Sequence, residues 1–185
     1  MIGALRSHGV ALPELLIVLC IMGIVAAAAI PIFSSDGTKR IDVAATEVAT
    51  ALRYARSEAL RSGEVHGVEI NQDTQHVVVY KANLTTNPVS MAAILPHPVD
   101  RKPYDLDFDT AMMTTGVIIG NDLDSFLYGA VRNKNLLFDT TGAPIWIVSS
   151  TETIHPLQDG MIRLVYGTQQ RTVRVAPYTG RVTVE

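Results

Sequence analysis

The sequence predicts an α+β fold in which one long N-terminal helix packs on a small antiparallel β-sandwich. Residues 10–33 form a nearly continuous apolar run, residues 34–63 place apolar side chains at helical spacing, and residues 64–185 contain short strand-like segments separated by turns. A helical pattern followed by a run of strands is typical of the α+β class. We therefore expect a leader at 1–9, a transmembrane half-helix at 10–33, an amphipathic half-helix at 34–63 and a β-rich globular domain at 64–185.

The composition excludes several classes of protein. With 48% apolar and 18% charged residues, the 185-residue chain is too apolar to be disordered. Its 15 basic and 18 acidic residues give a net charge of −3, which excludes a generally basic protein that coats nucleic acid. The single cysteine, Cys20, lies in the apolar run, so the globular part has neither a disulfide framework nor a cysteine-based zinc site.

The apolar run at 10–33 has 24 residues and one charge, Glu14. As a helix it would be roughly 36 Å long, enough to cross a hydrocarbon layer of about 30 Å. Arg6 precedes it, which predicts a cytoplasmic N-terminus. A cleaved secretory signal, cut within Ala26–Ala29, and a plain membrane anchor are the alternatives. Neither explains Glu14, because a carboxylate at mid-bilayer costs about 2.5–3.5 kcal/mol.

Residues 9–19, Gly-Val-Ala-Leu-Pro-Glu-Leu-Leu-Ile-Val-Leu, resemble the class III signal of type IV prepilins and type II secretion pseudopilins. The resemblance implies that a prepilin peptidase cuts after Gly9 and methylates Val10, although the family usually has Phe or Met there. Glu14 then falls at the family's glutamate position and Pro31 at its proline position, which implies that both are assembly residues. The implied partner of Glu14 is the N-terminal amine of a neighbouring subunit, and the alternative is a carboxylate that extends to the membrane surface.

The amphipathic half of the helix carries one apolar stripe at spacings of three and four residues. Its members are Ile41, Ala44, Ala45, Val48, Ala51, Leu52, Ala55 and Ala59. Gly63 is a natural C-terminal stop. We expect a helix from about residue 11 to 62, with a bend or local melting between Pro31 and Gly37, because both residues disfavour helix.

Three further segments, 52–63, 137–142 and 178–182, resemble the GspH/FimT group of minor pilins and pseudopilins. This implies a subunit at or near the tip of a type II secretion pseudopilus or type IV pilus, which assembles with other pilins through its N-terminal helix. It also implies a single pass through the bacterial inner membrane, a periplasmic globular domain and a filament after assembly. No cysteine follows Cys20 to close the C-terminal loop by a disulfide, as in many major pilins, and this favours a minor subunit.

The expected strands lie at 65–70, 76–82, 135–138, 145–149, 161–166, 172–175 and 181–184, with a proline-rich loop at 87–103. Residues 83–130 match no motif, and their role stays open.

We expect no enzyme activity, no cofactor and no metal. The histidines are scattered, and neither a phosphate-binding loop nor a nucleophile elbow is present. Two acidic groups could offer oxygen ligands to calcium: Asp105, Asp107 and Asp109, and Asp122 with Asp124. We favour an alternating strand for the first group, because the glycine and distal glutamate of a recognised calcium loop are missing.

Arg171, Arg174 and Arg181 are candidate DNA-contact residues, and the alternative function is a pilus-tip subunit that binds DNA for uptake. FimT-like members of the group are implicated in DNA uptake through a Gly-Arg-x-Arg pattern, but Thr183 replaces its second arginine here. Phosphate binding needs several cations on one surface. We therefore favour the interpretation that these arginines solvate a strand and its turn.

Overall fold

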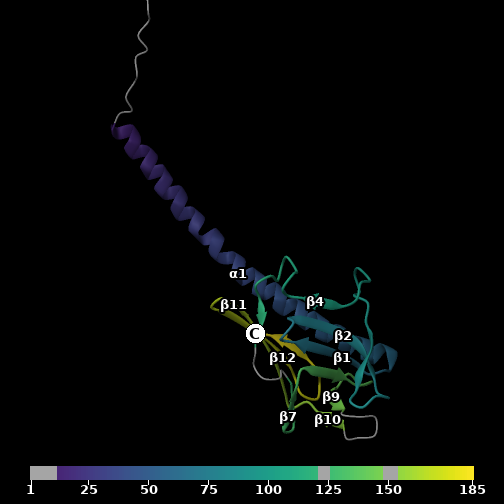
Figure 1. Cartoon of the computed structure of the whole chain (residues 1–185). Coiled ribbons are helices and arrows are strands. Elements are labelled where there is room, and N and C mark those ends of the chain that lie inside the picture. Colours follow the sequence, from purple (N-terminus) through teal and green to yellow (C-terminus); the bar gives the residue numbers. More distant parts are fainter. Residues whose placement is uncertain (1–11, 121–125, 148–153) are drawn as a thin grey trace, which may run out of the picture. The chain divides into compact units, whose positions relative to one another are not determined.

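A computed structural model describes residues 12–120, 126–147 and 154–185, with the side chains of residues 26–36 excepted (Figure 1). The chain divides into two units, Met1–Asp36 and Gly37–Glu185, which are treated separately below. The elements are α1 (Leu12–Ser62), β1 (His66–Asn71), β2 (His76–Asn83), β3 (Ser90–Ile94), β4 (Asp105–Asp107), β5 (Ile118–Ile119), β6 (Phe126–Tyr128), β7 (Val131–Asn133), β8 (Asn135–Phe138), β9 (Pro144–Ile147), β10 (Ile154–Pro156), β11 (Asp159–Tyr166), β12 (Gln169–Val175) and β13 (Val182–Val184).

The helix α1 confirms the predicted helix, which was expected to end at residue 62. Gly63 follows it with φ at 68°, and the Gly63 N–H donates to the Ala59 carbonyl over 3.1 Å. This left-handed glycine is the expected stop. Of the two expected outcomes between Pro31 and Gly37, a bend or local melting, the melting is wrong, because the backbone is helical throughout that segment; the bend stays a prediction. Hydrogen bonds on both sides propagate the helix cooperatively through one proline and one glycine.

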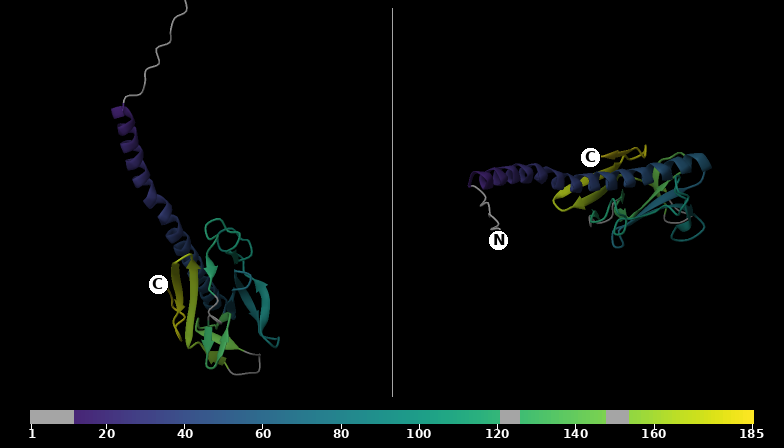
Figure 2. Two further views of the ribbon diagram at one scale, coloured as in Figure 1. Left: turned by 60° about the vertical axis from the view of Figure 1, so that its left-hand side comes forward. Right: turned by 90° about the horizontal axis from the view of Figure 1, so that it is seen from above.

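The described strands form two sheets in which every pairing is antiparallel. The first has the order β10-β9-β8-β1-β2-β3, with β4 also paired to β2, and the second has the order β13-β12-β11-β6-β7, with β5 paired to β11. Figure 2 shows the C-terminal strands in yellow as a group separate from the teal strands β1 and β2. The antiparallel part of the predicted fold is confirmed.

All seven predicted strands are present, as β1, β2, β8, β9, β11, β12 and β13. Residues 148 and 149 of the predicted 145–149 strand lie outside the described residues. The acidic segment at 105–107 is a strand, β4, as favoured. The expectation of a loop throughout 87–103 is wrong, because β3 lies inside it and pairs with β2. Its prolines fall on either side of Ser90–Ile94, so the strand itself keeps its backbone donors.

One hydrophobic core joins the Gly37–Ser62 part of α1 to both sheets. The predicted apolar stripe is confirmed, since each of its eight side chains is 0% exposed. The same cluster contains Val68 and Leu136 from the first sheet and Ile162 and Val173 from the second. The helix therefore supplies the surface on which both sheets are packed.

The first sheet also has a smaller apolar cluster that includes Tyr80, Leu137 and Ile145. Gly67 belongs to β1, and its register partners are Tyr80 on β2 and Leu137 on β8. A Cβ atom at Gly67 would lie 2.7 Å from Leu137 Cδ2 and 2.7 Å from Tyr80 Cζ. The two large side chains thus occupy the space that a side chain at position 67 would need.

We predict that Gly67→Ala lowers the free energy of unfolding by about 1–3 kcal/mol, as overpacking of a filled core does. Gly120→Ala is the matched control, because its nearest contact would be an ordinary 3.4 Å from the Arg163 carbonyl oxygen. Denaturant unfolding of the full chain measures both. Equal stability of the two variants would contradict the packing at Gly67.

A second prediction concerns His76 and Asp105, which join β2 to β4. His76 Nδ1 lies 2.7 Å from Asp105 Oδ1, and this hydrogen bond raises the pKa of His76 while burial opposes the rise. A raised pKa means that protonated His76 stabilises the fold below about pH 6.5, and that this stabilisation is lost as the pH rises through the folded-state pKa. Both side chains are about one-third exposed, so the effect is below about 1 kcal/mol.

Unfolding of the wild type and of His76→Asn should be compared from about pH 5.5 to about pH 8.5. We expect the wild-type advantage to be largest at the acidic end and to shrink as the pH rises. Because the other histidines are common to both proteins, the difference isolates His76. Parallel stability curves would show that the pair contributes nothing.

Candidate functional site

The first part of α1 exposes apolar side chains on every side. The large apolar side chains exposed in this part of the helix are those of Leu12, Leu15, Leu16, Ile17, Val18, Leu19, Ile21, Met22, Ile24 and Val25. Five of them are consecutive, so no polar face remains there, and a helix that is apolar all round needs burial outside itself. Glu14 is exposed in the first turn. A helix N-terminus favours a negative charge at that place.

Three other residues predicted to act in processing or assembly belong to the same part of the chain. Gly9 and Val10 lie outside the described residues. Pro31 lies within α1, and its side chain is among those not described. Among the helices that the structure describes, none has an apolar stretch long enough to cross a membrane.

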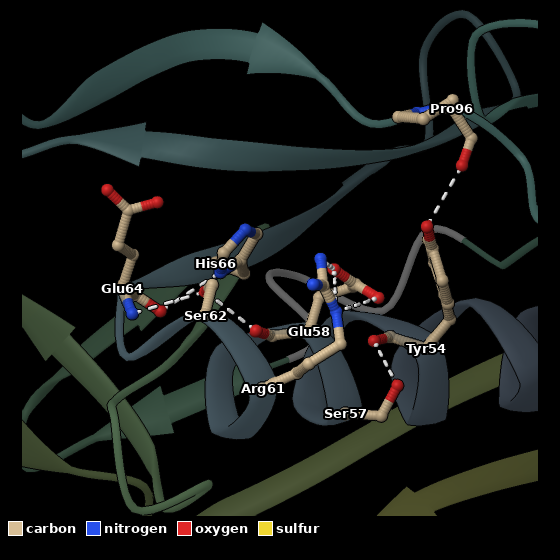
Figure 3. A network of polar contacts seen from close by, with 8 residues as sticks. All are labelled: Tyr54, Ser57, Glu58, Arg61, Ser62, Glu64, His66 and Pro96. Atoms are coloured by element: carbon tan, nitrogen blue, oxygen red, sulfur yellow. Dashed lines mark hydrogen bonds and ion pairs between the residues drawn. The ribbon is translucent and has the colours of Figure 1, made fainter.

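The end of α1 carries a network of polar contacts (Figure 3). Tyr54 Oη donates to the Pro96 carbonyl over 3.0 Å, which ties the helix to the loop after β3. Arg61 donates to the carboxylate of Glu58, and this hydrogen bond lowers the pKa of Glu58. The Ser62 hydroxyl donates to the Glu58 carbonyl over 2.7 Å. The polar residues of the 52–63 segment therefore hold the last turns of α1 together and connect them to the loop after β3.

The three segments that resemble the GspH/FimT group meet at Arg56. Its Nε donates to the Gly142 carbonyl over 3.0 Å, and Gly142 lies in the turn between β8 and β9. Gly180, which precedes β13, packs on the same place: a Cβ there would lie 2.8 Å from the Gly142 oxygen and 3.2 Å from Arg56 Nε. Both glycines have positive φ, 75° and 62°. The contact thus requires two residues without a side chain.

Two of the three candidate DNA-contact arginines form ion pairs. Arg171 Nε lies 2.7 Å from Asp42 Oδ1, and Arg174 Nε lies 3.0 Å from Glu185 Oε2. Arg174 Nη1 also lies 4.0 Å from Asp159 Oδ1. These carboxylates reduce the positive potential that a polyanion would meet. DNA contact by these residues stays a prediction.

Arg181 is instead brought next to two arginines of α1. A pocket of about 320 Å³ is lined by Arg53, Arg56 and Arg181, with Ser57 and Leu60 beside them. Arg53 and Arg56 were not predicted from the sequence to be functional. Their spacing of three placed both on one helix face, but only the sheet topology, which brings β13 to that face, reveals the third arginine.

In the acidic group at 105–109, the carboxylates of Asp105 and Asp107 already form hydrogen bonds with neighbouring residues. Asp105 binds His76, and Asp107 Oδ1 accepts the backbone N–H groups of Asp109 and Thr110 over 2.9 and 3.2 Å. The pKa of Asp107 is lowered, chiefly by a hydrogen bond from the Thr110 hydroxyl and further by these two backbone hydrogen bonds. In the described ranges, no three His, Cys, Asp or Glu side chains are grouped to hold a metal. Asp122 and Asp124 lie outside those ranges.

Comparisons with solved structures found several similar chains, among them a minor pilin and a minor pseudopilin. The type IV minor pilin FimU of Pseudomonas aeruginosa is 18% identical, with a TM-score of 0.48 over 78% of this chain and 87% of that chain. The minor pseudopilin EpsH from the Type 2 Secretion System of Vibrio cholerae is 16% identical, with a TM-score of 0.45 over 79% of this chain and 96% of that chain. A comparison with curated proteins found no match.

The model of the family described as Type II transport protein GspH matches residues 44–180. This range begins in the buried stripe of α1, includes every strand of both sheets except β13, and ends at Gly180 in the Arg56 contact. It covers well over half of the chain, and it contains the segments 52–63 and 137–142 and the start of 178–182, whose resemblance suggested the same group. The chain therefore belongs to the GspH family.

Proposed function

We propose that the chain is a minor pilin or pseudopilin that assembles at or near the tip of a type II secretion pseudopilus or a type IV pilus. Its role is structural and not enzymatic. Membership of the GspH family supports a part in type II transport or a related filament. The observation that carries the proposal is the helix at 12–25, which exposes apolar side chains all round and has one carboxylate in its first turn.

The proposal gives this helix two successive environments. Before assembly, residues 10–33 cross the bacterial inner membrane once, with the N-terminus cytoplasmic and the globular domain periplasmic. A span of this length and apolarity suits a bilayer, and Arg6 on the N-terminal side supports the orientation. After assembly, the same side chains pack against the N-terminal helices of other pilin-like subunits.

Glu14 has a specific role in this scheme. A carboxylate within an apolar layer needs a cationic partner, because an unpaired buried charge is strongly destabilising. Cleavage after Gly9 would create an α-amino group at Val10 that stays protonated near neutral pH. We propose that Glu14 of one subunit pairs with the N-terminal amine of its neighbour, and that Pro31 belongs to the same assembly segment.

Cleavage by a prepilin peptidase is testable directly. Mass spectrometry of the membrane-extracted protein should find Val10 at the N-terminus, carrying a methyl group. A Gly9→Leu variant is the control and should keep its leader, because the resemblance implies a cut after glycine. A mature N-terminus near Ala29 or Ile30 would indicate an ordinary secretory signal and would contradict the proposal.

The pairing role of Glu14 predicts a selective assembly defect. Glu14→Ala should insert into the membrane as the wild type does, since the span becomes more apolar. Its recovery in sheared filaments or in complexes with partner subunits should fall at least about tenfold, because removing one member of a buried ion pair costs about 3–5 kcal/mol. Cys20→Ala is the control: it changes an exposed side chain of the same helix but removes no charge, so this variant should assemble normally. Normal assembly of Glu14→Ala would refute the pairing.

A further inference from the structure

The pocket between the last turns of α1 and the start of β13 has an unusual charge. Arg53, Arg56 and Arg181 all line it, and no acidic side chain does so. By contrast, Arg171 and Arg174 have carboxylates at 2.7 and 3.0 Å. Three arginines therefore line one hollow of about 320 Å³, and its described lining includes no acidic side chain.

Two of the three guanidinium groups are held in place by main-chain carbonyls. Arg53 Nη2 donates to the Val182 oxygen and Arg56 Nε donates to the Gly142 oxygen, each over 3.0 Å. Each bond uses one of the five N–H donors of an arginine. A carbonyl orients the guanidinium group without neutralising it, so its remaining donors can bind an anion. The pocket is in this sense preorganised, with little side-chain entropy left to lose on binding.

We propose that this pocket binds a carboxylate of a neighbouring protein subunit. A guanidinium group matches a carboxylate through two parallel N–H···O bonds, and such charge-assisted pairs are the strong ones. Leu60 is half exposed beside the arginines, so it offers an apolar contact to the chain that carries the acidic group. The occupant that fits is an Asp or Glu side chain, or a C-terminal carboxylate, next to an apolar residue. Taking the partner to be another filament subunit rests on the proposed function.

The surroundings favour a single carboxylate over the phosphates of a nucleic acid. A nucleic acid needs cations along a line, and its affinity grows with each phosphate contacted. The adjoining hollow shares Arg181 but is also lined by Asp159, which is half exposed and would repel a second phosphate. Arg171 and Arg174, the other two candidate DNA-contact arginines, are paired with carboxylates.

The test uses the full chain in detergent and a fluorescent peptide of alternating glycine and glutamate. Its binding is followed by anisotropy at about physiological salt. The wild type should bind this peptide and should not bind the same peptide with glutamine in place of glutamate. Arg53→Gln and Arg181→Gln should each weaken binding roughly tenfold or more. Arg53→Lys, which keeps the charge but not the fork, should restore part of the loss.

Arg132→Gln is the matched control, since Arg132 is an exposed arginine on β7 away from this pocket. It should bind as the wild type does. Thermal unfolding checks that each variant folds. If Arg53→Gln does not fold, the binding measured for Arg181→Gln alone tests the inference. Equal binding by wild type and pocket variants would overturn the inference. So would preferential binding of duplex DNA that the same variants lose, because that would assign the pocket to nucleic acid.

A second measurement separates this inference from the proposed function. The Arg53→Gln/Arg181→Gln double variant keeps Glu14 and should be recovered in filaments several-fold less than the wild type. If it assembles normally while Glu14→Ala does not, the pocket inference fails and the proposed function stands. If Glu14→Ala assembles normally, the pairing of Glu14 is refuted while the subunit role stands. If the wild type itself is not recovered in filaments, the proposed function fails, and the peptide experiment still decides whether the pocket binds carboxylates.

Discussion

The domain depends on the close approach of two sheets to one alanine-rich helix face. Ala44, Ala45, Ala51, Ala55 and Ala59 are all fully buried between Ile41 and the end of α1. Because alanine adds little bulk, strands of both sheets can place larger side chains, such as Phe138 and Ile162, in the same core cluster. A larger residue in this face would have to displace backbone on one side, since protein cores are filled to crystal-like density. The helix thus sets where both sheets lie.

Arg56 links that helix to two turns that are distant in sequence. Its guanidinium group binds the Gly142 carbonyl, while Gly180 packs against both. The left-handed glycines are needed for this approach, because a Cβ at either one would come within 3.2 Å of neighbouring atoms. The segments 52–63, 137–142 and 178–182 are therefore one structural unit.

Much of the fold could be predicted from local patterns, and the candidate site could be predicted only in part. The apolar stripe at spacings of three and four gave the buried face of α1, and the polar turn at 71–75 gave the β1–β2 hairpin. The strand β3 was missed because it lies at a sheet edge among prolines and is exposed along its length, so it has no alternating pattern. The carboxylate partners of Arg171 and Arg174 depend on long-range packing, as does the meeting of Arg53 with Arg181, and no spacing rule encodes either.

The two parts of α1 meet different physical demands. From Ile41 to Ala59 a single stripe is buried, because the partner is the chain's own domain. At residues 12–25 every face is apolar, which suits lipid or several neighbouring helices but gives little directional preference. In the proposed filament, the affinity between subunits then comes from this apolar surface. The register of one helix against its neighbour must come from polar groups. In this proposed filament we expect Glu14 to fix the register of neighbouring helices within the apolar layer, where an unpaired charge is costly. In the same proposal, the arginine pocket lies near the C-terminal end of the helix, where the fork geometry of a guanidinium–carboxylate pair selects one orientation of the partner in addition to its contribution to affinity.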